Sequence, residues 1–250
     1  MSHRLSLSRY ALATKCSYWA RGDIEFTEEP PGEKARIGTL VHRLVEAHLT
    51  PGKKVHEDDV DLHELAQAME IFSGPLRGWV DAWASGPERR RVELRLRYEV
   101  DSDTVKETPR RGEPGYCRPG FREVTGELDF IKDYGTHLEV IDLKTGQKRY
   151  TNEEQLRSYA VLASRFWPTK LVRVAFLYAR KTKVELTPFV DLDADRLDAE
   201  AGDLRVTLLS VPGAEPKRGD HCFTCPLGRS RCPAYARDQS PTLLECESLF

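Results

Sequence analysis

The sequence predicts an α/β domain in which helices flank a mixed β-sheet. Four segments in the middle of the chain have the apolar pattern of strands: residues 92–100, 124–132, 137–144 and 170–178. Helical periodicity appears on both sides of these segments, and one predicted helix, residues 152–165, connects the third strand to the fourth. Such a crossover makes two strands parallel, whereas a hairpin makes its strands antiparallel, so the sheet is expected to be mixed.

The N-terminal part of the chain is predicted to be helical. Residues 34–48 carry apolar side chains at the spacing of one helix face, and a Thr-Pro-Gly turn follows them. A second helix is predicted for residues 58–72, and a third passes through two tryptophans. We therefore expect a helical part over about residues 34–85, within a single domain that spans residues 1–250.

The sheet-forming part is predicted to occupy about residues 91–190. A segment rich in Pro, Gly and Arg, residues 108–120, is expected to be a loop. Residues 183–190 are expected to form one strand that pairs with the strand before it. A helix over residues 193–209 and a Pro/Gly linker, residues 211–220, then lead to a C-terminal segment rich in cysteine.

Composition narrows the class of protein. The chain has 250 residues, enough for one large domain, and 38 basic against 40 acidic residues give a net charge of −2. This balance excludes a strongly basic, histone-like binder, although local basic patches can still bind nucleic acid. The sequence has neither a run of 18 apolar residues nor a secretory signal in residues 1–15, so a cytoplasmic location is expected.

Two aspartates are predicted to face each other across a hairpin. Gly135 and Thr136 separate two predicted strands, and a two-residue loop that begins with Gly suits a type II′ turn. In that register the numbers of paired residues add to 271, which places Asp129 opposite Asp142. Carboxylates about 4.5–5.5 Å apart at Cβ repel each other unless a cation lies between them. Mg²⁺ or Mn²⁺ would suit these hard oxygen ligands.

Lys144 is predicted to lie beside this pair of carboxylates. It follows Asp142 by two residues and therefore points to the same face of the strand. An ammonium group there can orient or deprotonate a water molecule and can stabilise negative charge in a transition state. Taken alone, however, such a triplet is more often an exposed salt bridge, here between Asp142 and Lys144.

Four motifs together resemble the PD-(D/E)XK nuclease superfamily, in particular its RecB-type exonuclease branch. They are GTLVHRLVE (38–46), GELD (126–129), IDLKTG (141–146) and QLRSYA (155–160). The resemblance implies a restriction-endonuclease-like sheet and a Mg²⁺- or Mn²⁺-dependent deoxyribonuclease. It also implies roles for particular residues: His42, Asp129, Asp142 and the Leu143 carbonyl would bind the metal, Lys144 would activate water, and Gln155 and Tyr159 would border the site from one helix face.

Glu93 has a less certain place in this pattern. It stands near the start of a predicted strand, where members of the family often carry a glutamate close to the site. A solvated strand residue would look the same in the sequence.

The C-terminal cysteines have the spacing of a metal centre. Cys222 and Cys225 form a C-x2-C pair, and Cys232 follows. The segment around Cys16 resembles the N-terminal cysteine segment of RecB-type nucleases with iron–sulfur clusters, such as AddB and the CRISPR-associated adaptation nucleases. This implies a [4Fe–4S] cluster held by Cys16 with the three C-terminal cysteines, zinc being the alternative. Two further cysteines, Cys117 and Cys246, are expected to be free thiols.

The expected substrate is DNA, with single-stranded ends favoured by the resemblance. Candidate phosphate contacts are Arg95, Arg97, Lys148 and Arg149, although a single residue of this kind is more often a solvated charge. The loop 101–122 could cover the site or steer a strand. The alternative function is a non-catalytic DNA-binding or iron–sulfur subunit of a larger helicase–nuclease. No P-loop motif is present, so a helicase or a recombination or adaptation partner would be a separate protein.

Overall fold

The computed structural model describes most of the chain. The predictions about Lys148, Arg149 and Cys246 lie outside the described residues. The described residues are 6–21, 30–55, 60–110, 113–117, 120, 122–146, 153–169, 171–223, 225–227 and 231–236.

Helices lie on both sides of the strands along the chain, as expected. None of the helices in the described part has both the length and the apolar character needed to cross a bilayer. The helical elements are η1 (Leu7–Arg9), α1 (Tyr10–Lys15), η2 (Tyr18–Ala20), α2 (Glu33–Leu49), α3 (Leu62–Ile71), η4 (Phe72–Leu76), α4 (Arg77–Ala84), α5 (Glu153–Phe166), α6 (Ala194–Ser210), η5 (Asp220–Phe223) and α7 (Pro233–Ala236).

The strands form one mixed sheet in the order β2-β1-β3-β4-β5-β6, and β7 also pairs with β5. β4 and β5 are parallel and α5 connects them, whereas the other pairs are antiparallel. The predicted fold class is therefore confirmed. The strands are β1 (Arg89–Glu99), β2 (Thr104–Glu107), β3 (Glu123–Asp133), β4 (Leu138–Lys144), β5 (Leu171–Arg180), β6 (Lys183–Leu186) and β7 (Val190–Asp193).

Two details of the predicted sheet were wrong. The single strand expected over residues 183–190 is two strands, β6 and β7, which pair with opposite ends of β5. Pro188 lies between them and has no N–H for a ladder, which explains the break. The segment expected to be a loop, 101–122, contains β2, an edge strand paired with β1.

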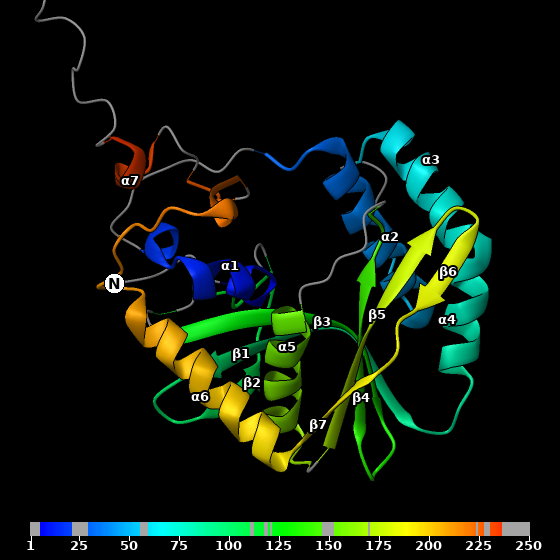
Figure 1. Cartoon of the computed structure of the whole chain (residues 1–250). Helices are drawn as coiled ribbons and strands as arrows, with labels where there is room; N and C mark the ends of the chain where they lie inside the picture. The colour runs from blue at the N-terminus through cyan, green and yellow to red at the C-terminus, as the bar shows by residue number, and fades with distance from the viewer. Residues whose placement is uncertain are drawn as a thin grey trace, which may run out of the picture.

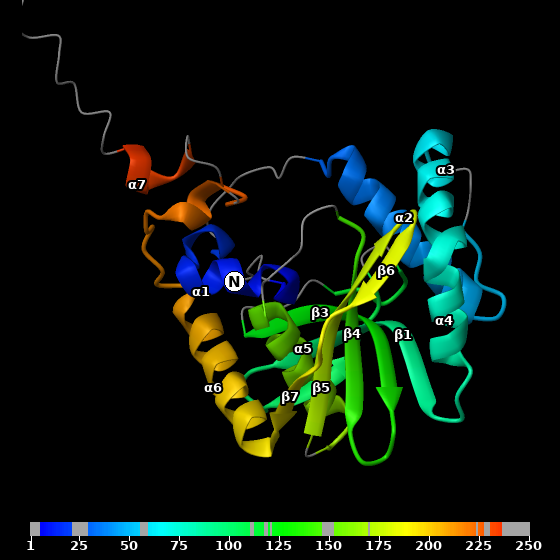
Figure 2. The same ribbon diagram turned by 45° about the vertical axis from the view of Figure 1, so that its right-hand side comes forward.

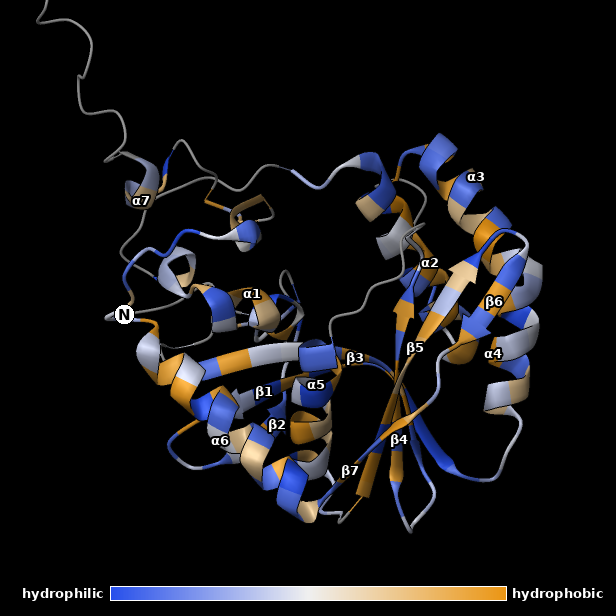
Figure 3. Cartoon of the chain, in the orientation of Figure 1, coloured by the Kyte–Doolittle hydropathy of each residue, from blue (hydrophilic) through white to orange (hydrophobic). Residues whose placement is uncertain are grey.

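The sheet separates two apolar cores. One lies against α2, α3 and α4 and includes Phe130 and Ile141. The other lies against α1, α5 and α6 and includes Leu128 and Val140. Figure 2 shows the two groups of helices on opposite sides of the strands, and Figure 3 shows β4 and β5 as predominantly hydrophobic. A strand with both faces buried is typical of parallel pairing under helices.

The hairpin between β3 and β4 has the predicted register. The partners run from Asp133–Leu138 to Phe130–Ile141, and each pair of numbers adds to 271. Gly135 has the positive φ, 78°, that the first loop position requires. The ladder stops one residue before Asp129 and Asp142. Beyond that point β3 continues with β1 and β2 away from β4 and β5, as Figure 1 shows.

Gly126, at the start of the GELD motif, lies where three side chains converge. A Cβ atom there would come within 2.9 Å of Leu7 Cδ1, 3.1 Å of Leu162 Cδ2 and 3.2 Å of Tyr159 Cε1. A larger residue would make these side chains shift, so glycine suits the close approach of the N-terminal segment and α5 to β3.

Candidate active site

A cavity of about 990 Å³ opens where β3 separates from β4. One face of α2 lines it, together with residues of β1, β3, β4 and α5. Nine residues named from the sequence line this cavity: His42, Glu93, Arg95, Asp129, Asp142, Leu143, Lys144, Gln155 and Tyr159. The cavity therefore brings together residues that are more than 100 positions apart in the chain.

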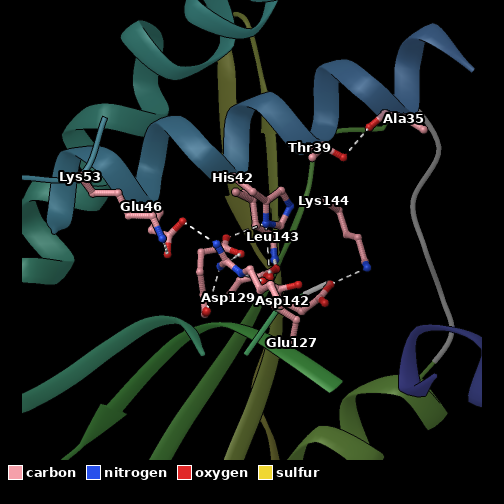
Figure 4. Close-up of polar contacts among 12 residues, drawn as sticks. Ala35, Thr39, His42, Glu46, Lys53, Glu127, Asp129, Asp142, Leu143 and Lys144 are labelled. Carbon is pink, nitrogen blue, oxygen red and sulfur yellow. Dashed lines mark hydrogen bonds and ion pairs between the residues drawn. The ribbon is translucent and has the colours of Figure 1, made fainter. Parts of the chain in front are cut away.

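Three of these residues form a cluster of possible metal ligands. His42 Nδ1 lies 2.7 Å from Glu93 Oε1 and 3.3 Å from Asp129 Oδ1. One ligand atom from each residue lies within 4.8 Å of the other two. Figure 4 shows His42 reaching from α2 toward Asp129. Glu93, which the sequence left undecided, is thus a direct neighbour of the two residues predicted as ligands.

A second group surrounds Asp142. Lys144 Nζ lies 2.7 Å from Asp142 Oδ2, and the Gln155 amide donates to Asp142 Oδ1 at 3.4 Å and to the Tyr159 hydroxyl at 2.8 Å. Lys144 Nζ also donates to Gln155 Oε1 at 3.4 Å. Gln155 and Tyr159 are buried, and their spacing of four places them on one face of α5. Gln155 therefore bridges Asp142, Lys144 and Tyr159.

The end of the hairpin ladder also fixes Asp129. The backbone N–H of Leu143 donates to Asp129 Oδ2 at 2.6 Å. The last pair of the β3–β4 ladder is Phe130 and Ile141, and Leu143 lies beyond it on β4. The Asp129 carboxylate therefore satisfies a backbone N–H that has no ladder partner in β3. The second oxygen of Asp129 is left to face His42.

The carboxylates are unfavourably close and buried. Burial and the charge of Asp129 raise the pKa of Glu93 to about 7, although His42 opposes the shift. Burial raises the pKa of Asp142 to about 6, with Lys144 opposing and Asp129 reinforcing this. Burial disfavours the His42 imidazolium, but the charges of Asp129 and Glu93 outweigh it and raise the pKa of His42 well above its ordinary value. A divalent cation would relieve this excess of negative charge.

Glu93 has an unusual backbone conformation for a strand residue. Its φ is 49°, in the left-handed region that residues other than glycine seldom adopt. The ladder between β1 and β3 pairs Val92 with Phe130 and Leu94 with Leu128 but omits Glu93. Such a conformation costs on the order of 1–3 kcal/mol and persists only where neighbouring contacts impose it.

Sequence reasoning missed Glu46 and Glu127, which line the cavity, and gave Arg110 no place among the residues of the metal site. Glu46 follows His42 by four residues on the same helix, so helical spacing could have indicated it. Arg110 lies in the predicted loop, where no periodicity marks a residue. Its guanidinium pairs with Glu46 at 2.8 Å and with Glu127, as well as with Glu93 at 3.6 Å.

Two of the predicted phosphate contacts, Arg95 and Arg97, lie in different surroundings. Arg95 lines the cavity and lies over the ring of Tyr116. Arg97, in contrast, is buried, pairs with Glu123 and donates to the Cys117 carbonyl. A buried arginine with these partners has a structural role, so we do not propose Arg97 as a DNA contact.

Comparison with known proteins places this geometry in context. A family model described as the PD-(D/E)XK nuclease superfamily matches residues 4–233. No curated protein sequence matches the chain. A solved structure from Eubacterium rectale, of a protein assigned as an exonuclease, is similar over 88% of this chain and 86% of its own, with 15% identity and a TM-score of 0.48. The structure of SSO0001 is similar over 90% and 96%, with 15% identity and a TM-score of 0.34. Neither likeness is informative about activity.

Proposed function

Because the chain belongs to the PD-(D/E)XK nuclease superfamily, we propose that it is a Mg²⁺- or Mn²⁺-dependent deoxyribonuclease. The observation that supports this proposal is that one cavity contains both a cluster of possible metal ligands and a lysine beside a carboxylate. The cluster of His42, Glu93 and Asp129 offers ligands to a cation, and Lys144 lies beside Asp142 in the same space.

The donor set fits a hard divalent cation. Asp129, Asp142 and Glu93 offer carboxylate oxygens and His42 offers an imidazole nitrogen. Leu143, whose carbonyl the resemblance implies as a ligand, also lines the cavity. We propose that these five groups include the ligands of the catalytic metal. A bound Mg²⁺ or Mn²⁺ would polarise a phosphodiester and lower the pKa of a water molecule.

Lys144 is the proposed residue for water activation. Its ammonium is held by Asp142 and Gln155, which fixes its position at the cavity wall. From there it can hold the attacking water and stabilise the negative charge that develops on phosphate oxygens. Tyr159 helps to fix Gln155, because its hydroxyl accepts a hydrogen bond from the Gln155 amide.

Exonuclease action on single-stranded ends is the finer proposal, supported by the resemblance of the four motifs to RecB-type exonucleases. The test compares linear DNA labelled at either end, in single- and double-stranded form, with a closed circular single strand. An exonuclease shortens the linear strands in the presence of Mn²⁺ and leaves the circle intact. Cleavage of the circle would replace the proposal with an endonuclease.

The alternative, a non-catalytic DNA-binding subunit, predicts a degraded site. Asp129, Asp142, Lys144 and Gln155 are all present and lie in one cavity, which favours the enzyme. DNA binding by wild-type protein without cleavage in any divalent metal would support the subunit, acting with a helicase or a recombination partner.

We propose that DNA phosphates approach along α2. Lys34 and Arg43 line the cavity, are exposed and, among the described residues, make no hydrogen bond or ion pair. Arg95 lines the same cavity from β1. Cations that no carboxylate neutralises are available to phosphates, and each such contact releases counterions.

Replacing Lys34 and Arg43 with Gln is expected to weaken binding of a labelled single strand and to flatten its salt dependence. The slope of log affinity against log salt should fall by about 0.7 for each lost contact. Fluorescence anisotropy in Ca²⁺ at several salt concentrations measures this slope. The matched control replaces Lys106 and Arg205, exposed cations on β2 and α6, and an equal change in the control would contradict the path along α2.

We also propose that Cys16, Cys222, Cys225 and Cys232 hold a [4Fe–4S] cluster. Three of them are buried, Cys225 is half-buried, and none is in a disulfide. In Figures 1 and 2, η5, which contains Cys222, lies beside α1, which ends at Lys15 directly before Cys16. Arg21 further joins the two regions by donating to the Ala214 carbonyl at 3.1 Å. Four thiolates suit either a cluster or zinc.

Protein purified without oxygen is expected to be brown and to contain iron rather than zinc. Cys16→Ala should remove most of the metal and lower the unfolding temperature, because the centre would fix both ends of the chain to the sheet. Metal analysis and visible absorption measure the first effect, and thermal unfolding measures the second. Cys117→Ala is the matched control, since Cys117 is exposed. Stoichiometric zinc would identify the alternative centre.

A further inference from the structure

Arg110 makes contacts that converge on Glu93. Its Nη2 donates to the backbone carbonyl of Glu93 at 3.0 Å and lies 3.6 Å from the Glu93 carboxylate. Nη1 donates to Glu46 Oε2 at 2.8 Å, and Nε pairs with Glu127. One guanidinium thus contacts α2, β1 and β3. It does so at Glu93, the residue of β1 that the ladder with β3 omits.

Hydrogen bonds hold the backbone at Arg110 in place. The Arg110 N–H donates to Glu113 Oε2 at 2.7 Å, and the Glu113 N–H donates to the Arg110 carbonyl at 3.0 Å. The N–H of Thr108 donates to the Arg95 carbonyl at 3.0 Å, which fixes the turn to β1. Arg110 is therefore presented from a fixed position rather than from a loose loop.

These contacts explain the conformation of Glu93. With φ at 49°, Glu93 has no ladder partner in β3, and Arg110 binds its carbonyl instead. The same rotation directs the Glu93 carboxylate to His42 Nδ1 at 2.7 Å. Loss of the guanidinium would remove this contact and allow Glu93 to relax from its left-handed conformation, which would shift its carboxylate relative to His42 and Asp129.

We propose that Arg110 is a positioning residue that holds Glu93 in the conformation in which its carboxylate joins His42 and Asp129 as a metal ligand. The proposal rests on the metal site proposed above. A simpler role for Arg110 would be to neutralise the surrounding carboxylates. The two roles differ because positioning needs the planar fork of donors, whereas neutralisation needs only a positive charge.

Arg110→Lys separates the two roles because it keeps the positive charge but removes the planar set of guanidinium N–H donors. Mn²⁺ affinity, measured by calorimetry or by the EPR signal of free Mn²⁺, is expected to fall about 10- to 100-fold, the range for residues that orient metal ligands. The Mn²⁺ concentration for half-maximal cleavage should rise equally, with kcat largely restored at saturating Mn²⁺. Arg122→Lys, at an exposed arginine that pairs with Asp101, is the matched control and should bind Mn²⁺ as wild type does.

Two further variants test the link to Glu93. Arg110→Gln should also weaken Mn²⁺ binding, whereas tighter binding would show that Arg110 only opposes the cation by its charge. Adding Arg110→Lys to Glu93→Gln should cause no further loss of affinity, because residues that act through one contact are not additive. An unchanged affinity in Arg110→Lys, or a full additional loss in the Glu93→Gln background, would overturn the proposal.

These outcomes are distinct from failure of the proposed function. Wild-type protein that binds no Mn²⁺ would remove the metal site itself. Wild-type protein that binds Mn²⁺ and cleaves DNA, with Arg110→Lys indistinguishable from it, would remove only the role of Arg110. Circular dichroism and unfolding midpoints confirm that the compared variants are folded, and Arg110→Lys retains the charge beside buried Glu46.

Discussion

Replacing Lys144 with Met is expected to reduce kcat for DNA cleavage by about 10³-fold, within the range for removing one transition-state donor or a general acid–base group. Met keeps most of the aliphatic stem, so the cavity wall should remain packed. Binding of a labelled single strand in Ca²⁺ should change little, because a single cation contributes only one phosphate contact. Single-turnover cleavage of end-labelled DNA in Mn²⁺ measures the rate.

The control for this prediction is Lys106→Met, an exposed lysine on β2 outside the cavity, which should cleave at the wild-type rate. A Lys144→Met protein that retains more than a tenth of wild-type kcat would contradict the assigned role. In that case the alternative reading of the sequence, an ordinary ion pair between Asp142 and Lys144, would be the better one.

Replacing Asp142 with Asn is expected to abolish Mn²⁺-dependent cleavage and, in the absence of metal, to stabilise the protein. The pKa of Asp142 is raised from 3.8 to about 6, so the folded protein favours its protonated form. Stability from this group is complete below pH 4 and is lost as the pH rises through 6. At pH 8 the neutral amide should therefore raise the free energy of unfolding by about 1–3 kcal/mol.

Urea unfolding at pH 8 and at pH 5, with EDTA present, measures the gain. The difference between Asp142→Asn and wild type should be largest at pH 8 and should shrink toward pH 5, where Asp142 is mostly protonated. Asp191→Asn, at an exposed aspartate on β7 that pairs with Arg173, is the control and should show no such gain. A variant less stable than wild type at pH 8 would show that the ion pair with Lys144 outweighs burial.

Periodicity predicted most of the fold. The alternation in β1, the apolar β4 and β5 and the amphipathic α2 each follow from local patterns that burial imposes on the sequence. The register of the hairpin followed from Gly135, because a two-residue turn fixes every pair after it. β2 was missed because a four-residue, largely exposed edge strand has too few apolar positions to show a period.

The candidate site was predictable where its residues share an element. Asp142 and Lys144 lie on one strand, and Gln155 and Tyr159 lie on one helix face, so spacing alone relates them. The participation of Glu93 depends on a positive φ and on contacts from α2, which no local pattern encodes. Arg110 reaches the site from a loop, and its relation to Glu46 exists only in three dimensions.

The distribution of the site along the chain has a consequence for the protein during synthesis. The hairpin of β3 and β4 and the helix α5 can assemble from neighbouring residues, whereas the contact between His42 and Glu93 spans 51 positions and lies upstream of them. A chain whose α2 has not yet docked on the sheet therefore carries the lysine and two aspartates without the histidine. Under the proposed function, such a partly folded chain lacks a complete metal site, so DNA cleavage would require the finished tertiary structure.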